Sequence, residues 1–218
     1  MAFFPRRVSS LGIWALGILM ALSAGAVPAR ADFLPPARPG ETDPIIQQVL
    51  NCWSYGHRPN AKGSGVGVGG QNLVCAHGEA KTTVMKDTIA RITSIDAQTL
   101  VIWSQGGGDP QAAADLAQTI VDRGITVIID GPCAGPCVWW LAAAPKRLVT
   151  PEAVFDFSAG PDAPPAVVDR VRQATGIDLN ALRQTGGPRQ PRDEAALRAL
   201  GLGVTQLPPI VAVKPTPT

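Results

Sequence analysis

Apolar runs alternate with segments of helical period through the middle of the chain. Residues 99–103 and 126–129 are almost uninterrupted apolar runs, typical of strands that are covered on both faces. Residues 72–76 and 153–157 also have the composition of strands. The pattern therefore predicts four main strands, separated by longer segments.

The longer segments repeat their apolar positions every three or four residues, as helices do. One helix is expected to begin at Pro110, a favoured first helical residue, and to stop at Gly124. The same periodicity predicts further helices at residues 82–92, 137–144, 164–175 and 192–200.

Strands that alternate with helices of this length imply right-handed βαβ crossovers. We therefore expect an α/β fold with a mostly parallel sheet flanked by helices, in one domain at residues 72–208. Residues 32–71 are predicted to form a Pro/Gly-rich arm with a short helix at 45–50. Its Gly-rich part, 60–71, is expected to be a mobile loop or hairpin turn, and residues 209–218 a Pro-rich tail.

Residues 1–31 have the organisation of a secretory signal peptide. Arg6 and Arg7 precede an uncharged apolar run, and Ala29 and Ala31 are the small residues that a signal peptidase reads. Cleavage is predicted near residue 32, which makes the protein periplasmic or secreted. The alternative is an uncleaved anchor, because the run is near the lower length limit for spanning a bilayer.

Charge argues against a nucleic-acid partner. Removing the three arginines of the signal segment from 19 Lys+Arg leaves 16 against 17 Asp+Glu, a net charge of −1. The charges form no basic stripe. Partners are therefore expected to be a protein or a small ligand, with no membrane association once the signal is cleaved.

Four cysteines lie in the mature part, where an exported protein meets an oxidising compartment. Three pairings are open to four thiols. Cys133 and Cys137 stand one helical turn apart, within reach of a disulfide, which favours this pair together with Cys52–Cys75. The rival is a metal site, but neither His57 nor His77 has zinc-type spacing from a cysteine. We predict no metal and no cofactor.

Two glycine-containing turns each connect a buried strand to a helix. Residues 104–109 (Ser-Gln-Gly-Gly-Gly-Asp) form the first, where backbone N–H groups and a helix start suit an oxyanion or phosphate. Gln111 replaces the third glycine of a dinucleotide fingerprint, and a P-loop ending is missing. Residues 131–140 form the second turn, one βαβ step later. The two helix starts are expected to meet at the carboxyl ends of neighbouring strands.

These two turns, in this order, resemble the ClpP/crotonase-like superfamily, especially its exported bacterial ClpP-like branch. The family motifs Ser-x-Gly-Gly and Cys-x-Ser-x-Cys match residues 104–107 and 133–137. Residues 77–79 and 194–202 resemble flanking parts of the same domain, so the likeness covers roughly residues 72–208. The resemblance implies repeated β-β-α units and a homo-oligomer, since related folds commonly form rings.

The resemblance also exposes three losses at the peptidase site. Gly135 stands where the family has its nucleophilic serine, and Pro136, which has no N–H, stands where an oxyanion donor is expected. Ser158 stands at the position of the general-base histidine. Gly106 and Gly107 remain as oxyanion-binding residues. A pseudoenzyme that acts as a binding or assembly module is therefore predicted.

An alternative keeps an enzyme, a hydrolase or lyase. It would use Cys133, whose thiolate a helix start would favour, or a carboxylate from Asp109, Asp156 or Asp162. In the simpler interpretation the cysteine is disulfide-bonded and the carboxylates are solvated turn residues. Other candidates are assigned structural roles: Ser104 as a turn residue, His57 and His77 as surface or edge histidines, Trp139 and Trp140 as packing residues.

Overall fold

The computed structural model describes residues 43–59, 61–104 and 106–210. They all belong to one compact unit, Pro36–Thr218; the other unit, Met1–Pro35, lies outside the described residues. The predicted signal peptide, the beginning of the arm and most of the tail therefore also lie outside them. None of the helices in the described part is both long and apolar enough to cross a membrane.

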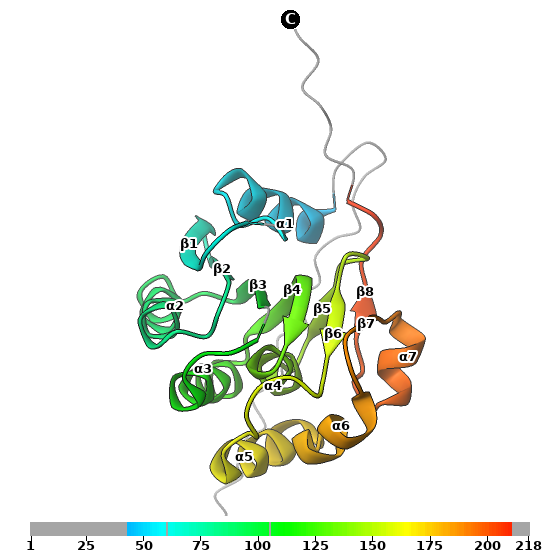
Figure 1. The fold of residues 1–218 in the computed structure, drawn as a ribbon. Coiled ribbons are helices and arrows are strands. Elements are labelled where there is room, and N and C mark those ends of the chain that lie inside the picture. The colour runs from blue at the N-terminus through cyan, green and yellow to red at the C-terminus, as the bar shows by residue number, and fades with distance from the viewer. Residues whose placement is uncertain (1–42, 60, 105, 211–218) are drawn as a thin grey trace, which may run out of the picture. The chain divides into compact units, whose positions relative to one another are not determined.

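The strands of the described residues form one mixed, mostly parallel sheet with the order β1-β2-β3-β4-β5-β8, in which β6 pairs with β4 and β7 (Figure 1). Only the β1–β2 and β6–β7 pairs are antiparallel among these strands. The bounds are β1 Gly65–Gly70, β2 Leu73–His77, β3 Thr99–Ser104, β4 Thr126–Ala134, β5 Arg147–Val149, β6 Val154–Asp156, β7 Gln190–Pro191 and β8 Thr205–Gln206. The predicted α/β class is confirmed.

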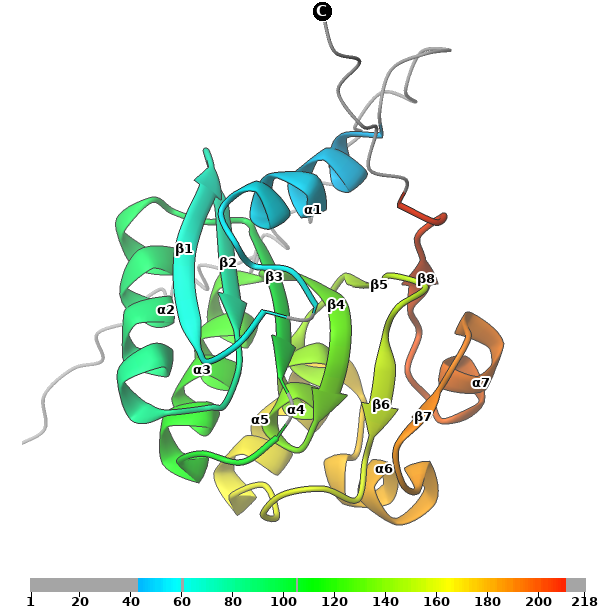
Figure 2. The same cartoon turned by 45° about the horizontal axis from the view of Figure 1, so that its top comes forward.

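Helices cover both faces of this sheet (Figure 2). Their bounds are α1 Pro44–Ser54, α2 Thr82–Ser94, α3 Pro110–Arg123, α4 Pro136–Ala143, α5 Pro165–Thr175, α6 Leu179–Gly186 and α7 Glu194–Ala199. Side chains alternate between the faces of a strand. Val74, Leu100 and Ile102 therefore pack with α2 to α5, whereas Leu73 and Val101 pack with α1.

Helix ends follow the expected local chemistry. Pro110 is the first residue of α3, the Asp109 side chain caps it, and Gly124 ends it in the left-handed conformation at φ 64°. The start at Pro110 and the stop at Gly124 were predicted from the sequence; the Asp109 cap was not.

Several elements differ from the sequence prediction. Residues 65–70, expected in a loop or hairpin turn, form the edge strand β1. Strand β4 continues through Gly131 and Pro132, where a turn was expected, because residues 132–134 pair with β6. Helix α6 and the short strands β5, β7 and β8 were not predicted.

Both predicted disulfides are confirmed. Cys52 at the end of α1 is bonded to Cys75 of β2, and Cys133 of β4 to Cys137 of α4. The first bond ties α1 to the sheet, and the second spans the turn between β4 and α4.

Candidate functional site

The two glycine turns meet at the carboxyl ends of β3 and β4. Ser104, the last residue of β3, pairs in register with Cys133 of β4. Two residues later, a Cβ atom placed on Gly106 would lie 3.3 Å from the Cβ of Ala134. The first turn is therefore packed against the residue that precedes Gly135.

Gly135 forms a sharp turn between strand and helix. Strand β4 ends at Ala134, Gly135 has φ 55° and ψ −119°, and α4 begins at Pro136. A nucleophile elbow places a serine on this kind of strained turn between a strand and a helix. A Cβ on Gly135 would lie only 3.1 Å from the carbonyl oxygen of Ala159. The loop after β6 thus occupies the space beside the turn.

Two backbone positions around Gly135 have no N–H free for a ligand. The Gly106 N–H donates to the hydroxyl Oγ of Ser104, 3.3 Å away in the protein interior. Pro136 has no N–H. Gly107, at φ 77°, has no atom within 4 Å of the position of a Cβ and so borders open space. Of the predicted oxyanion-binding residues, Gly107 is the one at the open surface.

Ser158 is placed close to the turn but is engaged with a carboxylate. Its Oγ donates to Oδ1 of Asp156 at 2.8 Å, and the same Oδ1 accepts from the N–H of Ser158 and of Ala159. This arrangement is an Asx turn that shapes the loop after β6. The side chains of Asp156 and Ser158 are therefore both engaged in hydrogen bonds within this turn.

The Asp109 carboxylate is also engaged in hydrogen bonds that stabilise the local structure. Its Oδ1 accepts from the N–H of Gln111 at 2.9 Å and its Oδ2 from the hydroxyl of Thr82 at 2.6 Å. The Thr82 hydrogen bond is the main reason why the pKa of Asp109 lies below its usual value. A carboxyl that stays ionised as a helix cap is poorly suited to general acid–base chemistry at neutral pH.

Replacing Asp109 with alanine is expected to lower the midpoint of thermal unfolding by about 2–4 °C, because α3 loses its cap and Thr82 its acceptor. Circular dichroism melting at pH 7 measures this. Asp115→Ala is the matched control, since Asp115 accepts from exposed Gln111 on the same helix. Equal midpoints for the two variants would contradict the capping role.

The structure does not favour the Cys133 alternative. The Sγ of Cys133 is bonded to Cys137, and both residues are fully buried. All four cysteines are described and none is free. A disulfide sulfur has no thiolate to attack a substrate, so Cys133 is not a nucleophile in this state.

The two tryptophans of α4 are packing residues. Trp140 is fully buried and its Nε1 donates to the carbonyl oxygen of Ala113 in α3 at 2.9 Å. Trp139 is 5% exposed. Trp139 also lines a small niche beside Gly135. Within the described ranges no three or more His, Cys, Asp or Glu side chains gather as a metal site would require.

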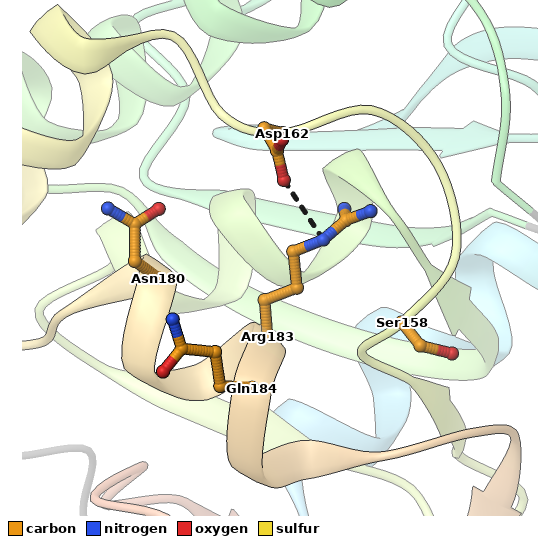
Figure 3. Close-up of a pocket in the computed structure, with 5 residues that line it drawn as sticks. All are labelled: Ser158, Asp162, Asn180, Arg183 and Gln184. Carbon is orange, nitrogen blue, oxygen red and sulfur yellow. Dashed lines mark ion pairs between the residues drawn. The ribbon is translucent and has the colours of Figure 1, made fainter.

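An open hollow of about 570 Å³ lies beside the loop after β6. Figure 3 shows its lining: Ser158 and Asp162 on the loop, and Asn180, Arg183 and Gln184 on α6. A smaller, more enclosed niche borders Gly135 and shares Asn180 and Arg183 with the hollow. These two side chains therefore form the wall between the hollow and the strand-to-helix turn.

Arg183 holds the loop in place. Its guanidinium donates to the carbonyl oxygens of Gly160 and Pro161, both at 2.9 Å, and its Nε lies 3.0 Å from Oδ1 of Asp162. Asp162 is 82% exposed, so the carboxylate faces solvent. Sequence reasoning identified Asp162 but missed the three residues of α6. The capping residue Asp178, followed by an amphipathic segment, was the signal for this helix.

His57 and His77 lie on the α1 face of the sheet, with Cys75, rather than at the glycine turns. Their Nδ1 atoms are 2.7 Å apart. His57 is 7% exposed and packs against the edge strand β1, so of the predicted surface or edge position it takes the edge one.

Comparison with known proteins gives structural matches only; no family model and no curated protein matches the chain. ClpP1 from Listeria monocytogenes is similar at 16% identity over 63% of this chain and 93% of that one, with a TM-score of 0.49. An enoyl-CoA hydratase/isomerase family protein from Silicibacter pomeroyi is similar at 17% identity over 66% and 76%, with a TM-score of 0.45.

A membrane-bound stomatin-specific protease is also similar, at 17% identity over 60% of this chain and 76% of that one, with a TM-score of 0.44. These matches concern the fold. Gly135 and Pro136 stand at the strand-to-helix turn, and Ser158 follows β6. The turn packs against Ala159 and Gly160, which directly follow Ser158.

Proposed function

We propose that the protein is an exported ClpP/crotonase-like pseudoenzyme that binds a protein segment or a small ligand without hydrolysing it. The observation that carries this proposal is the strand-to-helix turn at Gly135. The turn has the backbone conformation of an elbow but no side chain that can attack, and the residue after it has no N–H. Loss of the nucleophile and loss of the base both remove the chemical step.

Binding is supported by the hollow beside the turn. Its lining offers one hydroxyl, two carboxamides and an exposed ion pair. Carboxamides both donate and accept hydrogen bonds, which matches the alternating groups of a peptide backbone, and a guanidinium pairs with carboxylates. A peptide segment is therefore the ligand that best fits this chemistry.

Export is the second part of the proposal. Its supports are the signal-like residues 1–31 and the two disulfides, which persist in oxidising compartments. Assembly into a homo-oligomer belongs to the same proposal, because ClpP-type proteins commonly act as rings. Light scattering of the purified protein addresses this part separately.

The test is a binding and cleavage assay with a mixed library of labelled decapeptides. Fluorescence polarisation reports binding to the protein spanning residues 32–218, and mass spectrometry of the same samples reports cleavage. We expect saturable binding with intact peptides. Arg183→Gln is expected to weaken binding about tenfold or more, as loss of a charged contact does.

Arg170→Gln is the matched control, because Arg170 forms a surface ion pair with Asp122 and lies outside the lining of the hollow. Its binding is expected to equal that of the unaltered protein. Peptide cleavage above background would contradict the pseudoenzyme. No saturable binding, or equal weakening by both variants, would contradict the hollow as the peptide site.

A further inference from the structure

The segment between α1 and β1 crosses the carboxyl ends of the central strands. We call residues 55–59 and 61–64 the strap. In Figure 2 it runs from the end of α1 towards β4 and returns to β1. A Cβ on Gly131 of β4 would lie 2.8 Å from the Cβ of Pro59, and the Ser64 Oγ accepts from the Glu79 N–H at 3.0 Å. The strap therefore touches both β4 and the turn after β2.

A pair of histidines fastens the strap to the sheet. His57 of the strap and His77 of β2 form a hydrogen bond between their Nδ1 atoms at 2.7 Å, with the rings edge to face. The His77 ring stacks on Trp103 of β3, with the ring centroids 5.3 Å apart. The neighbouring strand β3 thus contacts the histidine pair through the Trp103 ring.

The glycines of β1 make room for this pair. A Cβ on Gly65 would lie 2.9 Å from Cε1 of His77, and a Cβ on Gly67 would lie 2.7 Å from Nε2 of His57. The alternating Gly-x-Gly pattern of this strand is therefore explained by the two imidazoles that pack against it.

A hydrogen bond between two Nδ1 atoms needs one donor and one acceptor. At least one of the two imidazoles must therefore be neutral. When both are protonated, each Nδ1 carries a hydrogen and each ring a positive charge, so the pair repels.

From this geometry we propose that the strap is an acid-sensitive latch: protonation of the His57–His77 pair releases the strap from the carboxyl ends of β2 to β4. The release is limited to the strap, because the Cys52–Cys75 disulfide keeps α1 attached. The latch is independent of the proposed peptide site.

The pKa values support this direction. Burial lowers the pKa of His57 from 6.5 to about 4, with smaller contributions from the charges of His77 and of Arg91 in α2. Burial also lowers the pKa of His77. A released histidine takes up its proton at a higher pH than a latched one. As the pH falls from 6.5 towards 4, proton uptake therefore favours release.

One neighbouring group acts in the opposite direction. Asp130 of β4 is fully buried, and Trp53 of α1 donates to its Oδ2 at 2.6 Å. Burial raises the pKa of Asp130 to about 6, the Trp53 bond lowers it and the charge of Glu152 raises it further. Protonation of this buried carboxyl in acid favours the closed state, so the Asp130→Asn variant separates the two effects.

Hydrogen exchange followed by mass spectrometry tests the latch in the protein spanning residues 32–218. Exchange rates of strap peptides are normalised to intrinsic rates and compared at pH 7, 6, 5 and 4.5. An opening coupled to one proton changes about tenfold per pH unit between the two pKa values. We expect strap protection to fall about tenfold or more from pH 6 to 4.5, while β3 and β4 stay protected.

The double variant His57→Gln/His77→Gln removes both titrating groups and is expected to give a strap whose protection no longer falls in acid. Asp130→Asn is expected to keep the acid release. Unchanged protection of the unaltered protein at pH 4.5 would overturn the proposal. A fall in protection in acid that survives in the double histidine variant would also overturn it.

Discussion

Replacing Gly135 with serine is expected to reduce the free energy of unfolding by about 1–3 kcal/mol without creating a peptidase. The φ of 55° strains any residue that has a side chain, and the new Cβ would lie 3.1 Å from the Ala159 carbonyl oxygen. The new hydroxyl would also have no histidine after His77 in the sequence to take its proton. Urea denaturation measures the stability, and ester and peptide hydrolysis the activity.

Gly107→Ser separates backbone strain from crowding. Gly107 has φ 77°, but no atom lies within 4 Å of the position of its Cβ. This variant is expected to show the smaller loss of the two. A Gly135→Ser protein that hydrolyses esters above background would show that a general base lies within reach of the turn. That result would refute the proposal that this site lacks the residues for hydrolysis.

Removing the Cys52–Cys75 disulfide is expected to cost more stability than removing Cys133–Cys137. The first bond closes a loop with a sequence separation of 23 and the second one of 4. Loop-closure entropy in the unfolded chain predicts losses of about 3.4 and about 1.9 kcal/mol. Urea denaturation of the paired variants Cys52→Ala/Cys75→Ala and Cys133→Ala/Cys137→Ala compares them.

The two double variants are well matched, because all four cysteines are fully buried and each variant deletes the same atoms. The difference between them therefore reflects loop length. A larger loss for the Cys133→Ala/Cys137→Ala variant would show that the second disulfide acts chiefly on the native state, by holding the turn at Gly135.

The regular part of the fold was predictable because its signals are local. Strands such as β3 are nearly continuous apolar runs, and α3 has Pro110 at its start and Gly124 after its end. The meeting of the two glycine turns followed from βαβ topology, which brings successive helix starts to one edge of the sheet. The Cys133–Cys137 pairing was predicted from helical spacing, but Cys133 lies in β4 and only Cys137 in a helix. The sharp turn at Gly135 brings the two residues together.

Features that depend on tertiary contacts were not predictable in this way. Strand β1 has little intrinsic strand propensity, and its glycines form a strand because β2 pairs with it and His57 and His77 fill the space above it. The partnership of these two histidines joins residues 20 positions apart through a strap without periodicity. The hollow needs α6, whose residue Arg183 reaches Gly160 and Pro161 across the loop.

The central claim is that no poised nucleophile exists where the two glycine turns meet. Intact-mass measurement after incubation with a serine-directed fluorophosphonate at pH 7.5 tests it most directly. An unchanged protein mass is predicted, because Ser104 is fully buried and the Ser158 hydroxyl is bound to Asp156. A stoichiometric adduct on either serine would contradict the account.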